Sequence, residues 1–155
     1  MSDIVAGKPR AIEATRMLLG EGIEEELFFR ALLDHLRIPG VQVENYGGKS
    51  KLGDYLKALS LRTGFSQVQK VGITRDADED PAGAAASVTK LIAEAGFPDS
   101  VTVTSMILPD NLSAGALENL FLRTITGNAI EACIGDYVAC EDPAPGRGNT
   151  TTDNA

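Results

Sequence analysis

Hydrophobic positions along the chain fall into two alternating patterns. Short runs of aliphatic and β-branched residues have the length and composition of strands, at 14–20, 41–46, 68–74 and 100–108. Longer segments repeat apolar side chains at helical spacing, at 21–36, 49–64, 81–96 and 116–124, with a further helix expected at 128–139. In the first helix the expected core stripe is Ile23, Leu27, Ala31 and the leucines at 32, 33 and 36. Strand and helix therefore alternate along most of the chain.

This alternation predicts the fold class. Four strand-helix units in series favour an α/β fold of the Rossmann-like type, with a mainly parallel four-stranded sheet and helices on both faces. Asp80 followed by Pro81 is typical of an N-cap and first helical position, and Gly96 of a helix end. We expect one domain over residues 1–140. Residues 141–155 contain no aliphatic side chain larger than alanine, which predicts a disordered polar tail.

Composition narrows the chemistry. The formal net charge of −8 repels nucleic-acid phosphates, so a nucleic-acid substrate would have to be held by a local binding site. The spacing of Cys133 and Cys140 suits neither a zinc knuckle nor a redox motif, and the single histidine, His35, excludes a multi-histidine zinc site. No apolar run approaches the length of a membrane span, and the first residues lack the apolar core of a secretory signal. A reducing, cytoplasmic setting without membrane contact is expected.

Four carboxylates gather directly after the third strand, at Asp76, Asp78, Glu79 and Asp80. Carboxylates this close disfavour one another's ionised form unless solvent, a cation or a helix N-terminus compensates. One interpretation is a solvated loop in which Asp80 caps the next helix. An EF-hand loop fails, because Pro81 and Ser87 replace its turn glycine and its bidentate glutamate. The favoured interpretation is a Mg²⁺ site, for which the carboxylates of Asp76 and Asp78 suffice.

Two further motifs lie at strand ends. Glu21 follows the first strand between two glycines, so it is expected at the same sheet edge as Asp76. The motif at residues 47–50, GGKS, lacks the first glycine of a P-loop, because position 43 is valine. What remains is a glycine turn into a helix N-terminus that carries lysines. It is either a weak phosphate site, with Gly48 and Lys49, or a plain solvated turn.

Four stretches of the chain together resemble a known family. They are LLGEGIEEELFFRALLDHL, YGGKSKL, VGITRDADEDP and ILPDNLSAGALENLFL. They are similar to the TOPRIM domain of topoisomerases, bacterial primases and OLD-type nucleases, and especially to the small stand-alone TOPRIM-like proteins of the DUF3226 family. The resemblance covers residues 14 to about 125.

The resemblance implies roles for particular residues. Glu21 corresponds to the family glutamate, Asp76 and Asp78 to the pair that holds Mg²⁺, and Glu118 to a later acidic metal ligand of OLD-like nucleases. Two departures stand out. Gly20 replaces an apolar residue, and Glu25 stands where an aspartate is common. The polar tail also replaces a longer C-terminal region.

These observations predict a Mg²⁺-dependent enzyme of phosphodiester chemistry, most simply a nuclease, with Mn²⁺ as the alternative metal. Glu21, Asp76 and Asp78 are the expected catalytic residues, while Lys49 and Arg75 offset phosphate charge. The expected partners are nucleic acid and a separate ATPase subunit, and a homodimer is left open. The alternative is a non-catalytic metal-binding, nucleotide-binding or regulatory subunit, which the strong negative charge favours.

Overall fold

The computed structural model describes residues 10–127 and Ala132. The chain divides after Leu120 into two compact units, and α4 (Leu117–Ile125) begins in the first and ends in the second. Except for Ala132, the predicted helix at 128–139 lies outside the described residues, as does the predicted tail at 141–155. No helix in the described ranges is long and apolar enough to cross a membrane.

The described elements follow the predicted alternation. The strands are β1 (Arg16–Gly20), β2 (Val41–Asn45), β3 (Lys70–Asp76) and β4 (Thr102–Leu108). The helices besides α4 are α1 (Ile23–His35), α2 (Leu52–Leu59) and α3 (Pro81–Ala95), with 3-10 turns η1 (Lys49–Lys51) and η2 (Phe65–Gln67). The predicted helix at 49–64 is therefore shorter than expected. Gly64 has a left-handed φ of 90°, and a Cβ there would lie 2.0 Å from the carbonyl oxygen of Ile12, so the chain turns tightly against the N-terminal segment.

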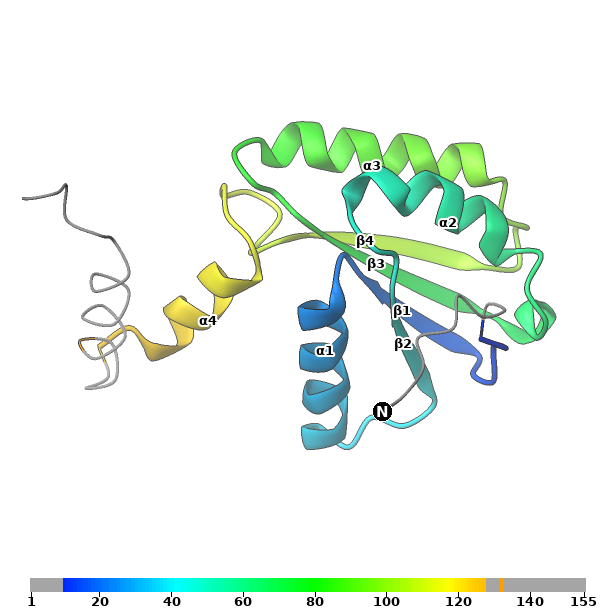
Figure 1. The fold of residues 1–155 in the computed structure, drawn as a ribbon, viewed down its shortest axis with the longest axis horizontal. Coiled ribbons are helices and arrows are strands. Elements are labelled where there is room, and N and C mark those ends of the chain that lie inside the picture. Colours follow the sequence, from blue (N-terminus) through cyan, green and yellow to red (C-terminus); the bar gives the residue numbers. More distant parts are fainter. Residues whose placement is uncertain (1–9, 128–131, 133–155) are drawn as a thin grey trace, which may run out of the picture. The chain divides into compact units, whose positions relative to one another are not determined.

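The sheet is entirely parallel, with strand order β2-β1-β3-β4. Figure 1 shows α1 on one face of the sheet and α2 and α3 on the other, so the predicted α/β class is confirmed. After β1 the chain passes through α1 to β2, on one side; after β3 it passes through α3 to β4, on the other. The connections thus diverge between the carboxyl ends of β1 and β3, which is where open α/β sheets bind ligands.

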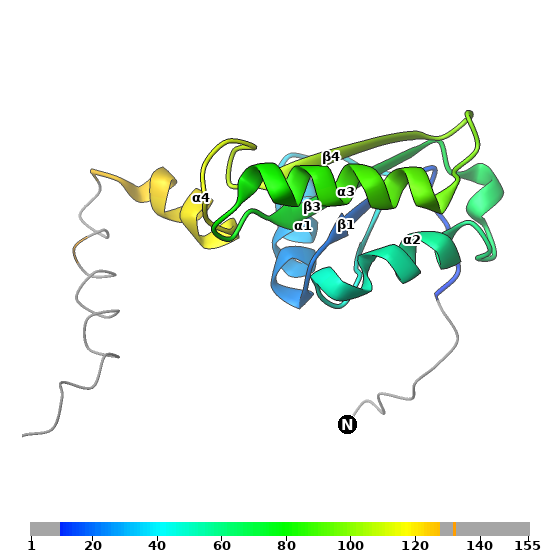
Figure 2. The same ribbon diagram turned by 90° about the horizontal axis from the view of Figure 1, so that it is seen from above.

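The two faces bury different amounts of hydrophobic surface. Beneath α2 and α3 lies the larger core, whose fully buried members include Leu19, Leu52, Leu56, Val71 and Val88. Figure 2 shows these two helices lying over the strands. A smaller cluster on the other face is built on Phe29, Val43, Leu108 and Leu117.

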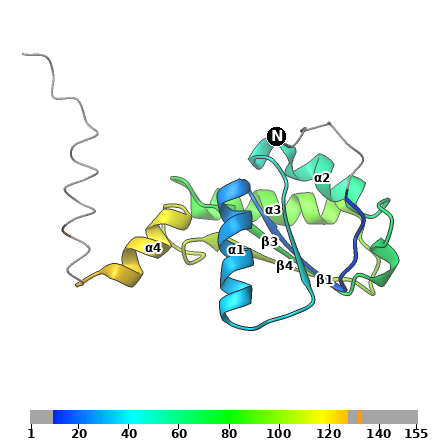
Figure 3. The ribbon, with the colours of Figure 1, turned by 60° about the horizontal axis from the view of Figure 1, so that its bottom comes forward.

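The predicted apolar stripe of α1 is wrong for most of its members, although Leu33 packs against the smaller cluster. Ile23, Leu27 and Leu36 are exposed by 58%, 57% and 54%. Helix α1, seen in front of the sheet in Figure 3, instead buries Phe29 together with Glu25 and Glu26. Polar residues four positions apart from a buried aromatic share its face, and hydrophobicity alone does not reveal that face.

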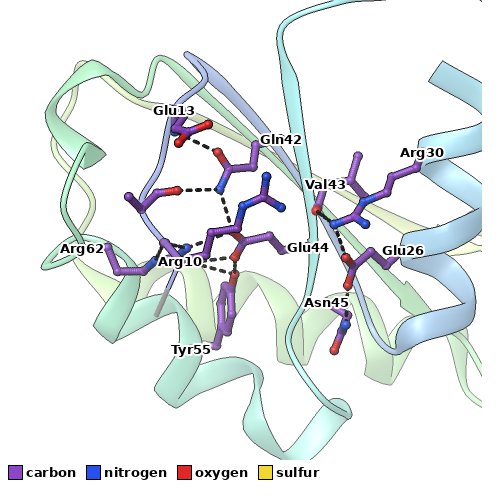
Figure 4. Close-up of polar contacts among 11 residues, drawn as sticks. Arg10, Glu13, Glu26, Arg30, Gln42, Val43, Glu44, Asn45, Tyr55 and Arg62 are labelled. Atoms are coloured by element: carbon purple, nitrogen blue, oxygen red, sulfur yellow. Dashed lines mark hydrogen bonds and ion pairs between the residues drawn. The ribbon is translucent and has the colours of Figure 1, made fainter. Parts of the chain in front are cut away.

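A polar network fastens β2 to α2 and to the N-terminal segment (Figure 4). The Glu44 carboxylate accepts hydrogen bonds from the Arg62 guanidinium at 2.7 and 2.9 Å and from the Tyr55 hydroxyl. Gln42 donates to Glu44 and to the carbonyl oxygen of Ala11. Although burial opposes ionisation, hydrogen bonds from these partners lower the pKa of Glu44 overall.

Candidate acidic site at the carboxyl edge of the sheet

Two carboxylates lie where the connections of β1 and β3 diverge. Glu21 directly follows β1, and Asp76 is the last residue of β3, its neighbour in the sheet. The Oε2 atom of Glu21 is buried and has no hydrogen-bond partner among the described residues. Leaving a buried polar atom unpaired costs free energy. The structure therefore places both predicted residues at one edge and leaves an acceptor without a donor there.

Glu25 is a third carboxylate of this edge, and the sequence-based reasoning did not assign it to the site. It is 8% exposed, and its Oε2 atom accepts a hydrogen bond of 2.8 Å from the Gly22 amide at the start of α1. A Cβ at Gly20 would lie only 2.6 Å from Cβ of Glu25. Gly20 and Glu25, the two departures from the family pattern, are therefore one coupled feature: the glycine makes room for the glutamate.

The electrostatics of Asp76 show that these carboxylates act on one another. Burial and the nearby charges of Glu25 and Glu21 raise the pKa of Asp76 to about 6, with a smaller contribution from Glu118. The Leu117 amide, at the start of α4, donates to Oδ1 of Asp76 at 3.2 Å and opposes this rise. Asp76 is consequently poised to change its protonation state close to neutral pH.

A buried tyrosine lies close to this cluster. The Tyr46 hydroxyl donates to the Thr74 carbonyl oxygen at 2.8 Å. Burial raises the pKa of Tyr46, and the charges of Glu21 and Asp76 raise it further, so the hydroxyl stays neutral. The cluster consists of Glu21, Glu25 and Asp76, with Glu118 at its exposed border in the first turn of α4. We call it the acidic cluster.

Asp78 points elsewhere. Its φ of 52° lies in the left-handed region, and its backbone exchanges hydrogen bonds of 2.9 and 2.7 Å with Gly115. The side chain is half exposed and forms an ion pair of 3.0 Å with Lys49. Asp76 and Asp78, predicted as one metal-binding pair, thus have different partners in the structure, because the backbone leaves the strand conformation at Asp78.

A hollow of mixed charge lies beside Asp78. It has a volume of about 650 Å³ and is lined by the cations Lys49 and Arg75, by the carboxylates of residues 78–80 and by the start of α3. Arg75 donates to the Ser87 hydroxyl at 2.9 Å, while its Nε atom is buried without a partner among the described residues. Asp80 caps α3 as predicted, accepting from the Gly83 amide at 2.9 Å, and Glu79 is exposed.

The glycine turn at residues 47–48 is bound to the acidic edge. The amides of Gly47 and Gly48 donate to the carbonyl oxygen of Glu21 at 3.1 and 2.9 Å. These amides are therefore already engaged, and Lys49 and Arg75 remain as the cations available to a phosphate. The turn's visible role is to hold Lys49 next to the Glu21 loop.

The donor chemistry of the acidic cluster fits Mg²⁺, which prefers carboxylate oxygens together with water. A nearby cation would supply the partner that the Glu21 oxygen lacks among the described residues and would offset the charges that act on Asp76. Within the described ranges, however, no three or more His, Cys, Asp or Glu side chains are arranged as a ready metal-ligand set. The carboxylates are close enough to repel one another without being assembled for coordination.

The fold and the site together define an α/β protein whose acidic cluster lies where the connections after β1 and β3 diverge. Residues 15–140 match the family described as "Protein of unknown function (DUF3226)", and the chain belongs to this family. No curated protein and no solved structure matches the chain.

Proposed function

We propose that this chain is a TOPRIM-like, Mg²⁺-dependent enzyme of phosphodiester chemistry, most simply a nuclease. The observation that carries the proposal is the acidic cluster, in which the buried Glu21 oxygen has no partner in the described structure and burial together with neighbouring carboxylates raises the pKa of Asp76 to about 6. Structural carboxylates are normally paired, whereas functional sites retain such unfavourable charge.

Glu21, Asp76 and Glu25 are the side chains proposed to hold the metal, with Glu118 as a further ligand from α4. A bound Mg²⁺ would supply positive charge that polarises a phosphoryl oxygen. Glu21 is proposed to be a metal ligand or the general base that accepts a proton from the attacking water.

Asp78 and the hollow next to it supply the phosphate-binding part of the proposal. Lys49 and Arg75 would offset the charge of a phosphate seated in the hollow. Because Lys49 is paired with Asp78, a phosphate that attracts Lys49 would release the Asp78 carboxylate. Asp78 could then contribute to metal binding as the resemblance to TOPRIM domains implies.

Cleavage assays test the enzyme directly. Purified protein is incubated with labelled single- and double-stranded DNA and RNA in Mg²⁺ or Mn²⁺. We expect metal-dependent cleavage that Asp76→Asn and Glu21→Gln abolish. Glu94→Gln is the matched control, because it removes one exposed carboxylate near the end of α3, outside the hollow, and should leave the rate unchanged. Cleavage that survives Asp76→Asn would assign the activity to a contaminant or to another site.

The second candidate is a non-catalytic metal-binding, nucleotide-binding or regulatory subunit. The net charge of −8 favours it, because the overall field repels nucleic-acid phosphates. A separate ATPase subunit that binds the nucleic acid would reconcile the negative charge of this chain with a role in nucleic-acid cleavage.

Thermal unfolding separates the two candidates from a plain solvated loop. Either candidate predicts that Mg²⁺ stabilises the wild type by RT ln(1 + [L]/Kd), about 1.4 kcal/mol when free metal is roughly ten times Kd. Asp76→Asn should lose this response, and Glu79→Gln should keep it. A metal response without cleavage favours the regulatory subunit. Equal responses to Mg²⁺ and to NaCl of the same ionic strength would refute metal binding.

A further inference from the structure

Strand β4 forms a border of the sheet and differs from the other three strands. In the described part of the chain it pairs with β3 alone, and Figure 2 shows it at the rim of the sheet. Its sequence, TVTSMIL, contains no charged residue, whereas β1, β2 and β3 each contain at least one. Proteins usually protect border strands with charges, prolines or covering elements. β4 has neither charge nor proline.

The backbone groups on the outer side of β4 can be identified from its register. The Thr102 amide donates to the Gln69 carbonyl oxygen beside β3, so the alternation of the strand turns the amides of Val103, Ser105 and Ile107 outward. Asn111 caps Ile107: its side-chain oxygen accepts from the Ile107 amide at 2.7 Å, and its own amide donates to the Ile107 carbonyl oxygen at 2.7 Å. For Val103 and Ser105, no outer partner lies within the described residues.

The outward backbone groups of Val103 and Ser105 can pair with the same groups of a second copy of the chain. In an antiparallel pair, two opposed residues exchange both of their backbone hydrogen bonds. A two-fold axis at Thr104 would oppose Val103 of one copy to Ser105 of the other, and the reverse, which satisfies all the outer groups left free. The same axis opposes Thr104 to its own copy and Thr102 to Met106. These three side chains are exposed, Met106 by 39%, and such cross-strand pairs stabilise sheets.

A hollow of mixed lining lies beside the same strand. It has a volume of about 360 Å³, and it is lined by Asp99 as well as by apolar residues that include Ile92, Phe97 and Val103. Val103 and Ile92 are only partly buried against the main core. A second copy paired along β4 would cover this hollow and bury apolar surface, in addition to pairing the backbone.

We propose that β4 is the homodimer interface, in which two copies join antiparallel into one sheet of eight strands, four from each copy. Two chains of net charge −8 repel each other, and this repulsion is smallest where the meeting surfaces carry no charge, as along β4. Because the two β4 strands run in opposite directions, the acidic clusters lie at opposite ends of the shared sheet. The interface is independent of the proposed enzymatic function.

Disulfide trapping tests the register. In a background with Cys133 and Cys140 replaced by serine, Thr104→Cys should form a disulfide-linked dimer under mild oxidation, because residues opposed at a non-hydrogen-bonded position have Cβ atoms about 4.5–5.5 Å apart. Thr102→Cys alone should cross-link poorly. Mixed with Met106→Cys, it should cross-link well. Cross-linking of Thr102→Cys alone as efficient as that of Thr104→Cys would overturn the register and the proposal.

Light scattering across a concentration series tests the dimer without cross-linking. Wild type should show the dimer mass, and Thr104→Lys, which places like charges on the axis, should raise the dimer dissociation constant at least about tenfold. Thr89→Lys is the matched control, since it adds the same charge on an exposed face of α3. A monomeric wild type up to the solubility limit would overturn the proposal. So would equal dissociation constants for the two lysine variants.

Discussion

Two groups of carboxylates in the same sheet have opposite surroundings. Glu44, on β2, is matched by the Arg62 guanidinium, the Tyr55 hydroxyl and the Gln42 amide, and its pKa is lowered. Asp76, at the end of β3, has one backbone donor and carboxylate neighbours, and its pKa is raised to about 6. Both are partly withdrawn from solvent, so burial alone does not explain the difference.

The difference teaches which carboxylates hold the fold together and which do not. Glu44 joins β2 to Tyr55 of α2, and its partners Arg62 and Gln42 extend the network to the segment at residues 10–13. The acidic cluster connects little and accumulates repulsion. The hydrogen bonds of Glu44 account for its place in the fold, whereas the unpaired Glu21 oxygen and the repulsion acting on Asp76 have no such explanation. This contrast is what directs attention to function.

The largest expected effect comes from breaking the matched group. Arg62→Met should destabilise the protein by about 3–5 kcal/mol, because it leaves the Glu44 carboxylate withdrawn from solvent without its cation. The Arg62 and Glu44 side chains are only 8% and 13% exposed. Urea unfolding measures the loss. Lys90→Met, which breaks the exposed pair with Glu94, is the control and should cost less than about 1 kcal/mol. Equal losses would refute the contrast.

The next effect concerns the close approach of Gly20 to Glu25 in the acidic cluster. Gly20→Ala should cost about 1–3 kcal/mol, because its Cβ would meet Cβ of Glu25 at 2.6 Å and force the backbone apart. At Gly22, on the other side of Glu21, the nearest atom to an added Cβ is a Glu25 carboxylate oxygen at 3.3 Å, so Gly22→Ala should cost less. Thermal melts compare the two. A larger loss for Gly22→Ala would contradict the coupling of Gly20 with Glu25.

A smaller effect, of opposite sign, is expected from the unmatched group. The pKa of Asp76 is raised on folding, so the stability it contributes is fully present only below the unfolded pKa of 3.8 and is lost as pH rises through about 6. Asp76→Asn should therefore stabilise the metal-free protein at pH 7, by about 1 kcal/mol after allowing for solvent screening, and not at pH 4. Melting temperatures across this range measure the difference.

Glu44→Gln gives the counterpart. The pKa of Glu44 is lowered on folding, so its contribution is present above the unfolded pKa and is lost as pH falls through the folded one. Glu44→Gln should therefore destabilise at pH 7, and the deficit should shrink in acid. If both variants shifted stability in the same direction at neutral pH, the two carboxylates would not differ as described.

The smallest effect is expected for the exposed ion pair between Lys49 and Asp78. Lys49→Ala breaks the pair with Asp78, whose side chains are 58% and 52% exposed, so unfolding free energy should change by less than about 1 kcal/mol. That change should shrink further in high salt. Under the proposed function, the same variant should nevertheless weaken phosphate binding clearly. A stability loss comparable to that of Arg62→Met would make Lys49 a structural residue instead.

The sequence alone determined the local features of this protein. Strand and helix alternate where hydrophobic spacing changes, and Asp80, Pro81 and Gly96 mark the ends of α3 because capping depends on neighbouring residues. The shared edge of Glu21 and Asp76 also followed, since each lies at the carboxyl end of a parallel strand.

Only the tertiary structure decided which side chains meet. The strand order β2-β1-β3-β4 makes β1 and β3 neighbours and so brings Glu21 and Asp76 close, and no local signal specifies that order. Likewise, Glu25 belongs to the acidic cluster because Gly20 has no Cβ to collide with it. Asp78 lies outside the cluster because its backbone is hydrogen-bonded to Gly115. Such contacts join residues remote in the sequence or depend on close backbone packing. Spacing and composition therefore predict the elements, while packing selects the partners.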